Sequence, residues 1–130
     1  MINRSPDIEV AHLDGFESVA SIIADRPLYH FSVVHSFRFF RHREDYLGDP
    51  WSDIELVMEE LEPPRAQIGL SFHRVADVSF SGFGQIMGLC FKSIQERGWE
   101  SLRYEVGDYE DGYIHLFCHK ISVFDPSSAV

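Results

Sequence analysis

Cysteine, positive charge and long apolar runs are all scarce in this chain of 130 residues. The two cysteines, Cys90 and Cys118, each stand inside an apolar stretch, so we expect two thiols rather than a disulfide. No apolar run approaches the roughly 18 to 20 residues that a membrane helix requires, and the first residues lack the apolar segment of a secretory signal. These absences predict a cytoplasmic protein that does not bind a membrane.

Basic residues are outnumbered by acidic ones. The 11 lysines and arginines stand against 21 aspartates and glutamates, which gives a formal net charge of -10. An acidic chain is repelled by phosphate backbones, so nucleic acid is disfavoured as a partner. The same charge suits a basic protein partner, although it also suits plain solubility.

Hydrophobic residues make up 45% of the chain, which is enough for the core of one domain over residues 1–130. Residues 124–130 have the composition of a frayed tail. One helix is predicted between Asp14 and Pro27, because apolar residues recur there at helical spacing. Asp14 can cap its start and Pro27 forces its end.

Most of the remaining chain alternates between apolar and polar residues, which is typical of strands. The alternation covers residues 31–40, 66–72, 78–80, 87–91, 102–106 and 113–123. Residues 53–61 fit a strand better than a helix, and the helix remains an alternative. Short loops between the strands favour antiparallel pairing. We therefore expect a strand-dominated α+β fold, with one antiparallel sheet of about six to seven strands and one N-terminal helix.

Two histidines and a cysteine lie close together in the last predicted strand. In a helix, His115 and His119 would share a face at zinc-binding spacing. In a strand they lie about 13 Å apart, at about 3.3 Å per residue, and Cys118 points to the other side. Tyrosine, isoleucine, phenylalanine and valine favour the strand, so we predict no metal site. A cleft lined by His35, His73 and His115 would be the enzymatic alternative.

No catalytic or cofactor-binding pattern stands out in the sequence. The glycines near residue 84 match neither GxGxxG nor a GK[ST] ending, and the stretch around Cys90 offers only Lys92 as a neighbouring base. We therefore expect no cofactor and no enzymatic activity.

Acidic residues cluster in three stretches, one of which contains Glu59, Glu60 and Glu62. Such a cluster is usually a solvated face, but aromatic residues among acids are typical of docking surfaces. The residues predicted to bind a partner are Asp49, Trp51, Asp53, Glu105, Asp108, Tyr109, Glu110 and Asp111.

The C-terminal half carries a pattern of sheet-core and turn residues, namely Phe72, Val75, Asp77, Val78, Phe80, Gly82, Phe83, Gly88, Leu89, Phe91, Phe117, Cys118, Ile121 and Val123. In this pattern it resembles bacterial immunity proteins of the immunity protein fifty family, or a related family of small uncharacterised bacterial proteins. The chain departs from the family pattern at "GFGQ", where an asparagine often follows the glycine and phenylalanine, and at "YHFSVV", where Ser32 stands near the place of an acid.

The resemblance implies a protein that binds and neutralises a cognate toxin inside the producing cell, without catalysis. An acidic surface would then face a basic toxin domain. An oligomeric scaffold is a further possibility, because unpaired sheet edges favour self-association and a homo-oligomer.

Overall fold

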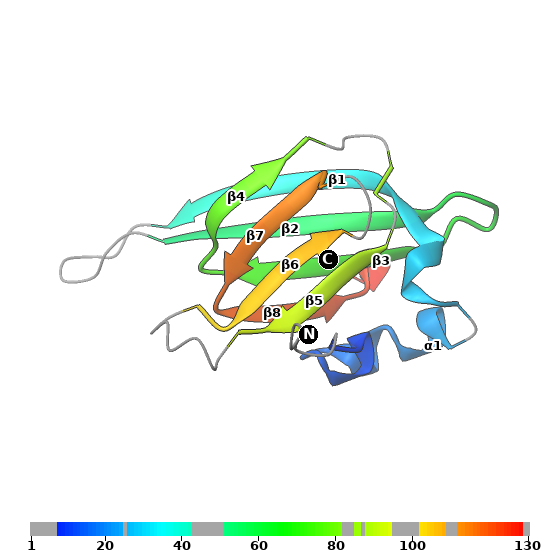
Figure 1. Ribbon diagram of the computed structural model, residues 1–130. Coiled ribbons are helices and arrows are strands. Elements are labelled where there is room, and N and C mark those ends of the chain that lie inside the picture. Colours follow the sequence, from blue (N-terminus) through cyan, green and yellow to red (C-terminus); the bar gives the residue numbers. More distant parts are fainter. Residues whose placement is uncertain are drawn as a thin grey trace, which may run out of the picture.

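The computed structural model describes residues 8–24, 26–42, 51–81, 85–86, 88–94, 102–108 and 112–128. Its eight strands are β1 (Phe31–His42), β2 (Trp51–Glu60), β3 (Gln67–His73), β4 (Ala76–Phe80), β5 (Leu89–Ser93), β6 (Tyr104–Asp108), β7 (Ile114–Cys118) and β8 (Lys120–Phe124). They form two four-stranded antiparallel sheets, with the strand orders β1-β2-β3-β8 and β4-β7-β6-β5. Figure 1 shows the second sheet lying across the first.

The predicted strand-dominated fold with antiparallel pairing is confirmed, but the prediction of one sheet of six to seven strands is wrong. The chain changes sheet at two corners. Arg74 and Val75 separate β3 from β4, and His119 alone separates β7 from β8. The two corners lie together, because the His119 backbone N–H donates to the His73 carbonyl at 2.8 Å. Two continuous segments, residues 67–80 and 114–124, therefore bend at these corners and join the two sheets at one edge.

The segment 113–123, predicted as a single strand, shows how a corner works. Ile114, Leu116 and Cys118 are fully buried, whereas the buried residues after His119 are Ile121 and Val123. The alternation thus shifts by one residue at the corner. This shift is required because the inner faces of both sheets must point into the same core.

One hydrophobic core lies between the sheets. The rings of Phe72 on β3 and Phe91 on β5 have centroids 6.5 Å apart, and Phe37 on β1 stacks on Phe80 of β4 at 4.1 Å. The buried members of the core are Leu13, Val19, Phe31, Ile54, Leu56, Met58, Ile68, Leu70, Phe72, Ile86, Leu89, Phe91, Val106, Ile114, Leu116, Cys118, Ile121 and Val123. Strand β2 covers residues 53–60 of the segment 53–61, so the helical alternative is wrong.

Strand β1 does not keep the strict alternation that its sequence predicts. Its pairing with β2 shifts register between Phe31 and Val33 and again between Val34 and Ser36. Phe31 is consequently buried, whereas His35 is exposed to solvent. At each register shift, an extra residue turns the side chains that follow it to the other face of the strand. Strict alternation therefore could not predict which residues of β1 are buried.

The predicted N-terminal helix is shorter than expected and is broken into η2 (Phe16–Ser18) and α1 (Ala20–Ile23), between η1 (Val10–His12) and η3 (Leu28–His30). Gly15, at a φ of 83°, is the N-cap of η2 and provides no side-chain cap. Instead of capping, Asp14 accepts the backbone N–H of Val123 with its carbonyl at 2.8 Å and pairs with Lys120 at 3.2 Å. The segment thus serves as a cover over β8.

Regular structure continues beyond the predicted start of the frayed tail. Phe124 is the last residue of β8, and its ring lies where a Cβ on Gly69 would stand. Pro126–Ser128 then form the turn η5. No helix in the described part of the chain is long and apolar enough to span a bilayer.

Candidate binding site

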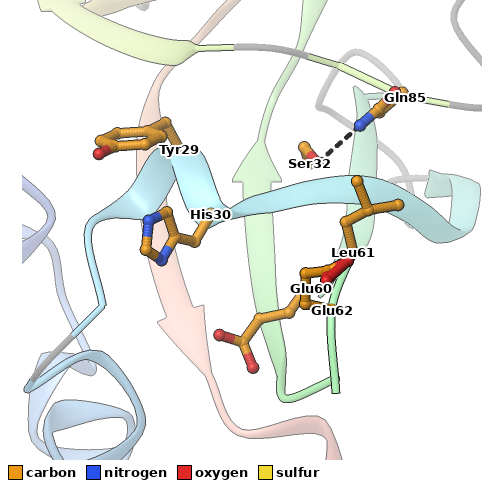
Figure 2. Close-up of a pocket in the computed structure, with 7 residues that line it drawn as sticks. All are labelled: Tyr29, His30, Ser32, Glu60, Leu61, Glu62 and Gln85. Carbon is orange, nitrogen blue, oxygen red and sulfur yellow. Dashed lines mark hydrogen bonds between the residues drawn. The ribbon is translucent and has the colours of Figure 1, made fainter. Parts of the chain in front are cut away.

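A cavity of about 340 Å³ opens between the turn η3 and the end of β2 (Figure 2). The pairing of Phe31 with Glu60 creates it, because residues just before Phe31 then lie beside residues just after Glu60. We name this cavity the Tyr29 pocket. It is lined by Tyr29, His30, Ser32, Glu60, Leu61, Glu62 and Gln85.

Glu60 is the charged residue held most firmly in the Tyr29 pocket. Its side chain is 11% exposed, and Oε2 pairs with Arg26 Nε at 2.9 Å. Its Oε1 accepts the backbone N–H of Ala66, also at 2.9 Å. A carboxylate taken out of water requires such partners, since its desolvation is costly. Glu60 therefore ties the η3 side of the molecule to the β2–β3 hairpin.

The wall near β1 is fixed by neutral polar groups. Ser32 is 4% exposed, and its hydroxyl accepts a hydrogen bond from Gln85 Nε2 at 3.2 Å, drawn as a dashed line in Figure 2. The Ser32 carbonyl accepts the backbone N–H of Ile86 at 2.7 Å. This wall is consequently bound to the chain that follows β4.

The rim of the Tyr29 pocket is apolar and open to solvent. Tyr29 is 58% exposed and Leu61 is 54% exposed, and both are among the five large hydrophobic residues that the described surface exposes most. The ring of His30 meets that of Tyr29 edge-on at 4.8 Å. Glu62 is exposed beside Leu61, and its side chain has no hydrogen bond or ion pair with any described residue. Exposed apolar side chains beside a carboxylate can take up an amphipathic cation.

The predicted partner-binding residues do not form one surface in the described part of the structure. Asp49, Tyr109, Glu110 and Asp111 lie outside the described residues. Trp51 and Asp53 project from the outer face of β2, opposite in alternation to the buried Ile54. Glu105 projects from the outer face of β6, in the other sheet, and Asp108 ends that strand. Asp53 and Glu105 therefore face away from each other across the core.

Trp51 and Asp53 are engaged with the corner between β3 and β4. The Arg74 guanidinium lies 4.7 Å from the centroid of the Trp51 ring. One oxygen of Asp53 accepts the Arg74 backbone N–H at 3.0 Å, and the other lies 3.5 Å from His73 Nδ1. Arg74 has a left-handed φ of 55°, which a non-glycine residue adopts at a cost, so these contacts stabilise the corner.

The three histidines of the enzymatic alternative do not meet. His35 lies 3.7 Å from Glu59, whereas His73 lies beside Asp53, six residues away along β2, or about 20 Å at strand spacing. His115 Nε2 contacts Glu105 at 2.7 Å on the outer face of the other sheet. The predicted cleft is therefore wrong as a single site. Within the described ranges, no group of three or more histidine, cysteine or acidic residues could hold a metal ion.

His73 nevertheless takes part in a row that the sequence did not reveal. Its Nδ1 faces Asp53 at 3.5 Å, and its Nε2 lies 3.2 Å from the hydroxyl of Ser122 on β8. Asp53 and His73 also line a cavity of about 250 Å³ with Phe40, Ile54, Glu55 and Ser71. An acid, an imidazole and a hydroxyl in this order are the elements of nucleophilic catalysis. Only the pairing of β3 with β8 brings Ser122 into the row.

Cys118 is a structural thiol. Burial removes it from water and raises its pKa from 9.0 to about 12, partly offset by a hydrogen bond from the Lys120 backbone. A thiol with this pKa is protonated at neutral pH and is a poor nucleophile. Cys90 is half-buried, and no disulfide joins the two residues.

No family model, no curated protein and no solved structure matches the chain. The resemblance to immunity proteins stays a prediction.

Proposed function

We propose that the protein is a non-catalytic protein-binding module that neutralises a basic bacterial toxin in the cytoplasm of the cell that produces both. The net charge of -10 supports a basic partner, since opposite charges accelerate encounter and disfavour wrong partners. The sequence resemblance of the C-terminal half supports toxin neutralisation. Binding requires no metal or cofactor.

The observation that carries the proposal is the Tyr29 pocket. Tyr29 and Leu61 expose large apolar surfaces to solvent, and the exposed Glu62 lines the same cavity. Burying such side chains at an interface is favourable, and tyrosine is frequent among the residues that dominate binding energy. In contrast, Trp51 and Asp53 are already occupied by Arg74 and His73. The partner therefore docks over the η3 turn and the β2–β3 hairpin.

Coexpression tests this proposal. The chain is expressed in a bacterial host together with the toxic domain encoded beside its own gene, and growth is measured. The wild-type chain restores growth, and the double variant Leu61→Ser with Glu62→Lys loses protection because it removes apolar area and reverses a charge. The matched control is Glu17→Lys, an exposed acid on η2 outside the pocket. Failure of the wild-type chain to protect, or full protection by the double variant, contradicts the proposal.

A second candidate function rests on the row of Asp53, His73 and Ser122. In that function Ser122 attacks an ester or amide carbonyl, His73 takes the hydroxyl proton and later gives it to the leaving group, and water hydrolyses the acyl-serine. A fluorophosphonate probe, which labels activated serines, tests it. Labelling of the wild type that is lost in Ser122→Ala and kept in Ser71→Ala supports hydrolysis, and absence of labelling excludes it.

A further inference from the structure

The chemistry of the Tyr29 pocket specifies what part of a partner it accepts. Among the described lining residues, two are carboxylates and none is lysine or arginine. Arg26 pairs with Glu60 from outside the lining, so two carboxylates and one guanidinium leave one net negative charge at the cavity. Tyr29 and Leu61 add large, solvent-exposed apolar surfaces to the lining. The complementary group is a cation on an apolar stem.

We infer that the Tyr29 pocket binds one arginine side chain of a basic protein partner, an inference that rests on the proposed function and names the group it recognises. The methylene stem of arginine packs on Leu61, and its planar guanidinium stacks on the open ring of Tyr29. Its N–H groups donate to the Glu62 carboxylate. The buried hydroxyl of Ser32 and the amide oxygen of the exposed Gln85 supply neutral acceptors in the lining.

Two features favour arginine over lysine. Both Glu60 oxygens are taken by Arg26 and Ala66, whereas the Glu62 carboxylate has no partner among the described residues and can accept two parallel N–H bonds from a planar guanidinium. An ammonium group is more strongly hydrated than a guanidinium and stacks less well on an aromatic ring, so it gains less from a half-open cavity. A cavity of about 340 Å³ is at the small end of ligand sites, with room for a side chain rather than for a helix.

The inference is tested with N-acetyl-arginine amide, titrated into the full chain and followed by backbone amide shifts in NMR. Shifts are expected at Tyr29, His30, Leu61 and Glu62, with a Kd on the order of 1 mM, since a ligand of this size gains roughly 0.3 kcal/mol per heavy atom. N-acetyl-citrulline amide, the neutral isostere, should bind at least about threefold more weakly, and N-acetyl-lysine amide with a free side-chain amine should fall between the two.

Variants separate the pocket from nonspecific attraction to an acidic protein. Glu62→Gln should weaken binding of the arginine amide about threefold, whereas Glu17→Gln, an exposed acid elsewhere, should leave it unchanged. Equal binding of arginine and citrulline amides, or shifts that spread over the surface and ignore Glu62→Gln, would overturn the inference. The titration needs no toxin: binding of the arginine amide without growth protection defeats the proposed function alone, and protection without binding defeats the pocket alone.

Discussion

The two ends of strand β2 carry similar residues and use them differently. At the Trp51 end, an aromatic ring and a carboxylate are paired with Arg74 and His73 of the neighbouring corner. At the Glu60 end, Glu60 is paired with Arg26, but Tyr29 and Leu61 remain open to solvent. An aromatic residue beside an acid is therefore not in itself a docking surface. What distinguishes the two ends is whether a described residue supplies a cation to the aromatic ring, as Arg74 does for Trp51 and none does for Tyr29.

The largest effect is expected for Glu60→Ala, which tests whether the buried carboxylate is structural. The substitution leaves the Arg26 guanidinium and the Ala66 N–H without their acceptor, so we expect a loss of about 2–3 kcal/mol in the free energy of unfolding. Urea unfolding should show a lower midpoint with an unchanged m-value. Glu17→Ala is the control and should stay within about 0.5 kcal/mol of the wild type. Equal midpoints for the two variants would mean that the Glu60 contacts do not stabilise the fold.

Tyr29→Ala should show the reverse behaviour. The ring is 58% exposed, so its removal should change the free energy of unfolding by less than about 0.5 kcal/mol. Affinity for the basic partner should fall about tenfold, or about 1.4 kcal/mol, because an aromatic anchor is lost from the interface. Calorimetric titration and urea unfolding on the same variant check both values. A variant that loses stability but keeps affinity would place Tyr29 with the structural residues.

Asp53→Ala probes the occupied end of β2. It removes the acceptor of the Arg74 N–H and the carboxylate facing His73, so a loss of about 1 kcal/mol in stability is expected with no change in partner affinity. Asp53→Asn keeps a side-chain acceptor and should lose less. Should partner affinity fall in both variants while stability holds, the predicted site around Trp51 would be the true docking surface.

Much of the fold is readable from the sequence because strand residues alternate. Ile54, Leu56 and Met58 point inward as the period of two predicts, and so do Ile114 and Leu116. Alternation tells which face of a strand is buried but not which other strand pairs with it. A corner of one residue, such as His119, shifts the alternation of buried and exposed residues by only one position. The division into two sheets therefore could not be predicted from the sequence.

The candidate site was readable only in part. The acids at 59, 60 and 62 form a visible cluster, and their position around the end of a predicted strand places them near a turn. Tyr29 and Ser32 lie some thirty residues earlier, and it is the pairing of Phe31 with Glu60 that brings them to the same cavity. The two register shifts in β1 set that pairing, and bulges leave no clear sequence signal. For the same reason, because strand pairing cannot be predicted from alternation, the sequence did not show that Ser122 lies beside His73.

The smallest effect is expected for Glu62→Gln, the open carboxylate of the Tyr29 pocket. Stability should not change measurably, because the side chain is exposed and contacts no charged group among the described residues. The association rate with the basic partner should fall about twofold to threefold at low salt, since one steering charge is lost, and the difference should vanish near 0.5 M salt as screening removes it. Stopped-flow kinetics over a salt series measure this, with Glu17→Gln as the matched loss of one charge. Equal slowing by both variants would show that net charge, rather than the position of Glu62, guides the encounter, and the two ends of β2 would then differ in stability alone.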